Sequence, residues 1–280
     1  MPGSMDEPDT TPATERQGPL ATLRLFLSFA LAAWILRSLI LAPFSIPSGS
    51  MLPTMYIGDY LFVHKWPYGY SRFSFPLQIP SFEGRIWSAL PKRGDIVIFR
   101  PVGQEDADWV KRVIGLPGDR VAVRRGSVIL NGRPLRRTPA GLIGVPISPN
   151  SPCRVVPGAS PLVRTAADGG QECLYPAYRE TNPEGRSYLT LDQVDVPRAD
   201  DNAETTVPAG HLFLMGDNRD DSLDSRYSPY EGGIGLVPID HVVGRASARF
   251  WSTDGSAEWV KPWTWFSALR PGRIGRTQDR

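Results

Sequence analysis

Cysteine is almost absent from this chain of 280 residues, with only Cys153 and Cys173 present. The chain has no CxxC pair and no Cys/His cluster, so we expect no structural zinc site and no metal or other cofactor. Two cysteines that lie outside the cytoplasm can form one disulfide, whereas in a reducing compartment they stay free thiols. The sequence leaves both alternatives open.

An excess of charge is also absent, because 31 basic and 29 acidic residues give a net charge of only +2. A nucleic-acid partner would need a concentrated basic face, so we expect none. Histidine is scarce, with only His64, His211 and His241. Two of these lie in strand-like runs and no GxSxG motif is present, which disfavours a Ser-His-Asp triad.

Only one hydrophobic run is long enough to cross a membrane. Leu25 to Phe44 is 20 residues long, and its one charge, Arg37, lies near the end, where it can reach the headgroups. Two arginines precede the run, and residues 45–64 contain no Lys or Arg. We therefore expect a single anchor over 20–43, a disordered cytoplasmic segment over 1–19, and the remainder outside. A cleaved secretory signal is the alternative.

The rest of the chain favours short strands, because glycine and proline are frequent and apolar runs are short. We expect a mainly β catalytic domain from 44–137 and 206–280. Residues 138–205 are rich in Pro, Ser, Ala and Gly, and we expect them to form an inserted, loop-rich subdomain. The predicted strands are Tyr60–His64, Asp95–Phe99, Trp109–Ile114, Arg120–Val123, Ser127–Leu130, His211–Met215 and Val242–Phe250.

A small hydroxyl-rich segment, Ser48-Gly49-Ser50, follows the hydrophobic run directly. A serine nucleophile needs a base and an oxyanion hole, and Gly49 permits close backbone approach. Taken alone, the segment is better described as a linker that leaves a membrane.

Lys111 has an unusual place in its predicted strand. Alternation puts it on the same face as Trp109 and Val113, where an ammonium would lose solvent. Desolvation lowers the pKa of a lysine, and a neutral lysine can act as a general base near pH 7. A lysine on an edge strand that reaches water is the alternative.

A third polar segment, Gly216 to Arg226, follows a predicted apolar strand. A calcium loop is disfavoured because Arg219 occupies a ligand position and Ser222 replaces the required glycine. A network that braces an active site fits better, with Ser222 orienting Lys111 and Asp224 paired with Arg226.

Four segments together resemble bacterial type I signal peptidase, or leader peptidase. They occur in the order typical of that family, behind the hydrophobic run. They are Pro47-Ser48-Gly49-Ser50-Met51-x-Pro53-Thr54, Arg93-Gly94-Asp95-Ile96-Val97, Lys111 to Asp119, and Gly216 to Arg226.

The resemblance implies a Ser/Lys dyad serine protease of the bacterial cytoplasmic membrane, anchored by one helix, with its catalytic domain on the outer face. It implies cleavage of preprotein signal peptides after an Ala-x-Ala-like motif at the lipid bilayer. The family fold is a coiled antiparallel β-sheet core with an inserted smaller domain. A related peptidase of narrower duty and a non-catalytic membrane-tethered β scaffold are the alternatives.

The resemblance also implies roles for individual residues. Ser50 matches the nucleophile and Lys111 the general base. Ser48 and Ser50 match the oxyanion hole. Ser222, Asp224 and Arg226 match the supporting network. The residues that match the shallow substrate pockets are Phe44, Ile46, Met51, Ile98 and Val110.

The chain departs from the family pattern at two places. Ala42 stands where the family often has Glu, and the segment 228–236 is longer than usual and lacks a Trp. The second departure affects the expected conformation of that loop and leaves the dyad intact.

Overall fold

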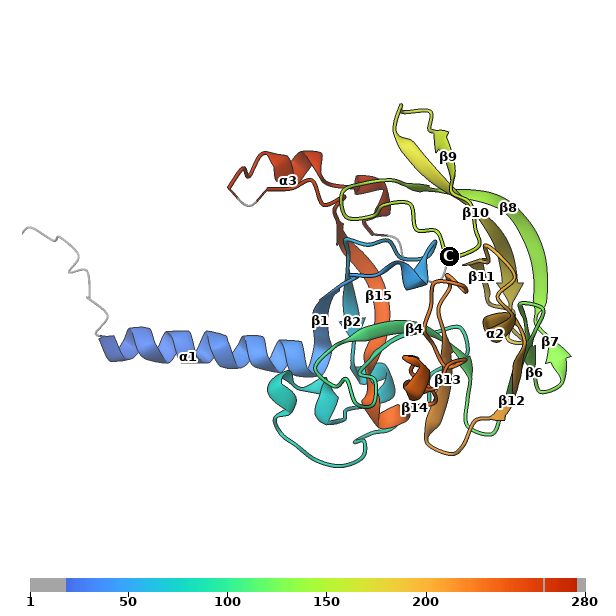
Figure 1. The fold of residues 1–280 in the computed structure, drawn as a ribbon. Coiled ribbons are helices and arrows are strands. Elements are labelled where there is room, and N and C mark those ends of the chain that lie inside the picture. Colours follow the sequence, from blue (N-terminus) through green and yellow to red (C-terminus); the bar gives the residue numbers. More distant parts are fainter. Residues whose placement is uncertain (1–18, 259, 276–280) are drawn as a thin grey trace, which may run out of the picture.

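The computed structural model describes residues 19–258 and 260–275 of the chain (Figure 1). The disordered segment expected over 1–19 therefore lies, except for Pro19, outside the described residues. The described part is mainly β, as predicted, with one long apolar helix at its N-terminal end.

The N-terminal helix α1 (Pro19–Ile35) continues through one π-helical turn, Leu36–Ile40. The 22 residues from Pro19 to Ile40 are long and apolar enough to cross a membrane, and none of α1 is buried. The helix projects away from the rest of the molecule (Figure 1). The predicted span 20–43 is not helical throughout, because strand β1 (Leu41–Ser45) begins before it ends. Pro43 has no N–H to donate, so it cannot continue the helix.

The largest sheet has seven strands in the order β1-β2-β15-β3-β4-β13-β14. Every neighbouring pair in it is antiparallel. The five strands predicted for this part of the chain are confirmed within two residues at each end. The strands after β1 are β2 (Asp59–His64), β3 (Ile96–Phe99), β4 (Trp109–Gly115), β13 (His211–Met215), β14 (Val237–Pro238) and β15 (Val242–Ser252).

Two smaller sheets of four strands each lie beside the first. One has the order β12-β5-β6-β7, and the other has β11-β10-β8 with β9 paired to β10. Their strands are β5 (Arg120–Arg124), β6 (Ser127–Leu130), β7 (Arg133–Pro134), β8 (Arg136–Pro146), β9 (Leu162–Thr165), β10 (Gln171–Thr181), β11 (Ser187–Leu191) and β12 (Asn202–Thr206). Two short α-helices, α2 (Pro197–Asp200) and α3 (Thr264–Ser267), and several single 3₁₀ turns lie in the connections of the described chain.

The segment expected to be loop-rich, 138–205, contains long strands. Both β8 and β10 extend over 11 residues and pair along most of their length. Most of β8 is exposed on both faces, so it has no apolar run and no alternation by which the sequence would have shown it. The final part of the segment, β12, pairs with β5 in a different sheet.

The buried apolar residues form four clusters. The smallest contains Leu52, just after Ser50, together with Cys173 and Tyr175 of β10. Cys173 is joined to Cys153 by a disulfide, with the two Cα atoms 5.3 Å apart. The disulfide therefore ties the segment around Cys153 to β10. This link lies in the same apolar cluster as Leu52, two residues after Ser50.

Candidate active site

Ser50 lies in a single 3₁₀ turn, Gly49–Met51, and is 8% exposed. Asn218 holds this turn in place through two hydrogen bonds. Its main-chain N–H donates to the Ser50 carbonyl oxygen at 3.0 Å, and its Nδ2 donates to the Gly49 oxygen at 3.1 Å. Because the Gly49–Ser50 peptide is trans, the Ser50 N–H points away from the bonded Gly49 oxygen.

Lys111, in the middle of β4, is 3% exposed and contacts Ser50 directly. The distance from Lys111 Nζ to Ser50 Oγ is 2.7 Å. The Nζ atom also lies 5.5 Å from the centre of the Trp109 ring, on the strand face that alternation predicts. Burial lowers the pKa of Lys111 to about 8, although Asp224 and Asp221 act in the opposite direction. The neutral amine is therefore accessible at mildly alkaline pH.

A second buried lysine shows that a lowered pKa alone does not identify a base. Burial, followed by the charge of Arg37, lowers the pKa of Lys65 to about 8 as well. Its ammonium, however, donates to the main-chain oxygen of Ser74, which is not a nucleophile. The contact with Ser50 distinguishes Lys111.

The Ser48 side chain lies at the open side of the same site. Its Oγ is 3.4 Å from Ser50 Oγ, and the residue is exposed. The Ser48 hydroxyl thus lies beside the Ser50 side chain. A hydroxyl and a main-chain N–H are typical donors of an oxyanion hole.

The loop after β13 contains a fully buried ion pair beneath Lys111. Arg226 donates twice to Asp224, at 2.9 and 3.0 Å, and Asp224 also accepts the Gly216 N–H at 3.0 Å. Burial favours the neutral acid, but the Arg226 guanidinium outweighs it and holds the pKa of Asp224 below its usual range. The predicted Asp224–Arg226 pair is present in the structure.

Ser222 is brought to the site without the expected bond to Lys111. Its Oγ is buried and has no hydrogen-bond partner among the described residues. Gly216 lies between Ser222 and Ser50. A Cβ added to Gly216 would overlap Ser222 Oγ and would lie only 2.6 Å from the main-chain oxygen of Ser50. Only glycine fits between the two serines.

A cavity of about 380 Å³ opens beside Ser50 and Lys111. Among the five predicted pocket residues, Val110 alone lines it. Ile46, Met51 and Ile98 are instead buried in the core, and Phe44 packs against the same cluster. For these four residues the assignment to the substrate pockets stays a prediction, because their side chains belong to the apolar core beside the cavity.

The cavity wall contains residues that sequence reasoning missed. Arg154 and Asp221 form an ion pair there, with 2.8 Å between Arg154 Nη2 and Asp221 Oδ1. The other missed residues are Pro47, Asp108, Trp109, Asp220, Leu223 and Tyr227. Arg154 comes from the long segment between β8 and β9. The only sequence signal there was the neighbouring Cys153, a candidate for a disulfide. None of the three histidines, all within the described residues, lines this cavity.

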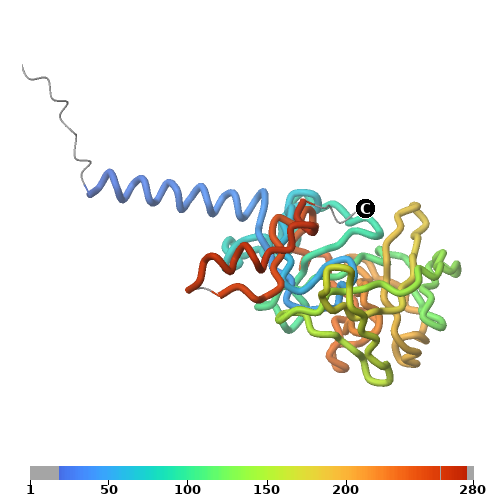
Figure 2. Tube along the Cα trace, turned by 90° about the horizontal axis from the view of Figure 1, so that it is seen from above, coloured from blue at the N-terminus to red at the C-terminus, as the bar shows by residue number. Residues whose placement is uncertain are grey.

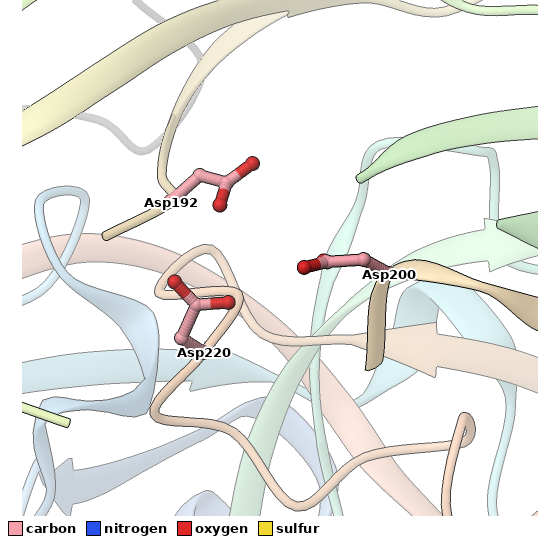
Figure 3. A group of neighbouring side chains, drawn as sticks. All are labelled: Asp192, Asp200 and Asp220. Carbon is pink, nitrogen blue, oxygen red and sulfur yellow. The ribbon is translucent and has the colours of Figure 1, made fainter. Parts of the chain in front are cut away.

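Asp192, Asp200 and Asp220, the last of which lies in the loop after β13, come together in the structure (Figure 3). Their carboxylate oxygens lie within 4.8 Å of one another, so they are the one set of His, Cys, Asp or Glu side chains in the described chain close enough to hold a metal ion. Each already has a partner: Arg137 pairs with Asp192, and main-chain N–H groups donate to the other two. Burial and the neighbouring carboxylates raise the pKa of all three, although Arg137 and Arg226 partly offset this.

Replacing Asp200 with Asn is expected to raise the melting temperature by roughly 1–2 °C at pH 7.5. The folded-state pKa of Asp200 is raised, so its contribution to stability is full below the unfolded pKa and is lost as the pH rises through the folded pKa. Asparagine removes that loss and still accepts from the Val196 N–H. Thermal unfolding at pH 5 and pH 7.5 measures the difference, which should be larger at pH 7.5. Exposed Asp106→Asn serves as the control, and a variant no more stable than wild type at pH 7.5 contradicts the prediction.

Comparison with known proteins agrees with this site. The family model described as "Signal peptidase, peptidase S26" matches residues 20–251. The chain belongs to this family. It is a hydrolase of the signal peptidase type, and the matched residues include the whole site described above.

Two curated relatives give the same assignment. Signal peptidase I of Rickettsia typhi is 33% identical over 229 residues, covering 79% of this chain and 76% of the relative. Signal peptidase I of Rickettsia prowazekii is 33% identical over 239 residues, covering 81% and 80%. A solved signal peptidase I from Enterococcus faecalis is 24% identical with a TM-score of 0.28, over 56% of this chain and 97% of that chain.

Proposed function

We propose that this member of the family is a membrane-anchored endopeptidase that removes signal peptides from exported preproteins after a small-x-small motif. The observation that carries the proposal is the buried 2.7 Å contact between Lys111 Nζ and Ser50 Oγ. A serine paired with a lysine whose pKa is lowered to about 8 is an activated nucleophile. Both residues line the cavity in which a peptide would lie.

The proposed mechanism uses this chain's own groups at each step. Neutral Lys111 takes the Ser50 proton as Ser50 Oγ attacks the scissile carbonyl carbon. The Ser50 N–H and the Ser48 hydroxyl stabilise the oxyanion that forms. The protonated Lys111 then gives its proton to the leaving amine, and an acyl-enzyme ester on Ser50 remains. Water, deprotonated by Lys111, hydrolyses that ester and releases the signal peptide.

The remaining polar residues support Lys111 in this proposal. The Asp224–Arg226 pair is buried and fixes the loop that carries Ser222 and Gly216. The buried Ser222 hydroxyl has no hydrogen-bond partner among the described residues. We assign it to orient Lys111 when substrate is bound. We assign Val110 to the substrate pocket because it lines the cavity.

We place the enzyme on a bilayer, with α1 as its anchor, the N-terminus inside and the catalytic part outside. Residues 44–137 and 206–280 form that catalytic part, and 138–205 are its insertion. The helix and the segment around α3 project on the same side of the molecule (Figures 1 and 2), and Trp263 and Phe266 there are exposed. Apolar side chains on that side suit a lipid surface, and the disulfide suits an oxidising compartment.

A cleavage assay tests the function. The purified full chain, in detergent or lipid vesicles, should cut a preprotein with Ala-x-Ala before the junction, and mass spectrometry should find the new N-terminus directly after the second Ala. A matched preprotein with Trp in place of that Ala should be cut roughly 100-fold more slowly, because a large side chain does not fit a shallow pocket. Absence of cleavage, or cleavage indifferent to the Trp, would falsify the proposal.

A further inference from the structure

Lys111 is surrounded by carboxylates that each have an arginine partner. Asp224 pairs with Arg226, and Asp217 with Arg112, whose Nη2 lies 2.6 Å from Asp217 Oδ2. The third carboxylate, Asp221, pairs with Arg154. Asp224, Asp221 and Asp217 each favour the ammonium form of Lys111, whereas Arg226 opposes it. The charge balance around the lysine therefore depends on whether these pairs are intact.

The pair of Asp221 and Arg154 differs from the other two in its surroundings. The other two pairs are almost completely buried, with all four side chains at most 4% exposed. The Arg154 and Asp221 side chains are 37% and 20% exposed and line the cavity beside Ser50. It is thus the one of the three pairs that solvent or a bound peptide can reach. The other acids on the cavity wall have partners elsewhere: Asp108 pairs with Arg100, and Asp220 accepts main-chain N–H groups.

Arg154 is held in place by its own segment. The neighbouring residue Cys153 is joined to Cys173 of β10, and the Arg154 N–H donates to the Tyr175 hydroxyl at 2.8 Å. Its aliphatic stem lies against Gly49, where an added Cβ would be 2.6 Å from Arg154 Cδ. The main chain and the aliphatic stem of Arg154 are therefore held in place, and its guanidinium contacts Asp221 directly beside the Ser50 turn.

We infer that Arg154 is a positioning residue that compensates the charge of Asp221 and so favours the neutral amine of Lys111. The inference rests on the proposed function, because it concerns the residue assigned there as the base. Without Arg154, the full charge of Asp221 would act on Lys111 and favour its ammonium form. Without Asp221, the unpaired Arg154 would act in the opposite direction.

The test is the pH dependence of kcat/KM for preprotein cleavage. Arg154→Gln is expected to move the midpoint upward by roughly 0.5 pH unit, which by itself reduces activity at pH 7 about threefold. Asp221→Asn is expected to move the midpoint downward. The double variant, which lacks both charges, should return close to the wild-type midpoint.

Arg164→Gln is the matched control, because Arg164 pairs with Glu172 at 2.7 Å in the neighbouring sheet and does not line the cavity. Its midpoint should equal that of wild type. The inference is overturned if Arg154→Gln has the wild-type midpoint, or if Arg154→Gln and Asp221→Asn shift the midpoint in the same direction. In either case, cleavage of the preprotein by the wild type would still support the proposed function. A wild type that cleaves no preprotein would overturn the function itself.

Discussion

Replacing Ser50 with alanine is expected to reduce kcat/KM for preprotein cleavage by about 10⁴-fold or more. The change removes the oxygen that lies 2.7 Å from Lys111 Nζ and that attacks the carbonyl in the proposed mechanism. The main-chain bonds from Asn218 to the Ser50 turn do not involve the Ser50 side chain, so the turn should keep its shape. Product formation over time, followed by mass spectrometry, measures the loss.

Two measurements separate loss of chemistry from loss of folding. The melting temperature of Ser50→Ala should stay within about 2 °C of wild type, since removing one hydroxyl from a partly open site changes little packing. Ser81→Ala, an exposed serine in the loop between β2 and β3, should cleave at the wild-type rate. Near-normal cleavage by Ser50→Ala would mean that another group is the nucleophile.

Replacing Lys111 with methionine is expected to cause a loss of similar size, about 10⁴-fold. Methionine keeps the apolar stem beside Trp109 and removes the amine. Because the two residues act as a unit, the double variant with Ser50→Ala should be no less active than either single variant. In the wild type, activity should rise as the pH rises through about 8, where Lys111 loses its proton. A pH–rate profile of kcat/KM measures this midpoint.

The stability of Lys111→Met provides an independent check. The folded-state pKa of Lys111 is lowered, so keeping this buried group charged below pH 8 costs stability that methionine does not cost. The variant should therefore melt at or above the wild-type temperature at pH 7. Lys92→Met, at an exposed lysine, serves as the control for activity. A wild-type midpoint near the ~10.4 of a free lysine would contradict a desolvated base.

The sequence predicted most of the strands that carry the site. The strands of the largest sheet alternate or are continuously apolar, so their positions could be derived from pattern alone, as could the face of β4 on which Lys111 lies. Ser50 by itself was indistinguishable from a linker residue. Its pairing with Lys111 spans 61 residues of sequence, and only the resemblance to a known family connected the two before the structure did.

Other parts of the site could not be predicted, for physical reasons. Arg154 reaches the cavity through a disulfide and a contact with Tyr175, neither of which leaves a periodic signal. The strand β8 is mostly exposed, so the hydrophobic pattern did not report it. Ile46, Met51 and Ile98 are apolar residues near the nucleophile, but whether they face the cavity or the core depends on how the sheet curves in three dimensions.

The strand that follows the helix has a further consequence for how a scissile bond is chosen. Only β1 and a short turn separate Ile40 from Ser50, and β1 is paired along its whole length with β2. The pairing continues past its end, because Ile46 donates to the Asp59 oxygen at 2.8 Å. A five-residue strand is about 17 Å long and does not stretch. The proposed nucleophile is thus held at a fixed distance from the proposed membrane anchor. Scissile bonds at that one distance from the lipid surface would be cleaved, and identical motifs closer to the lipid or farther from it would not.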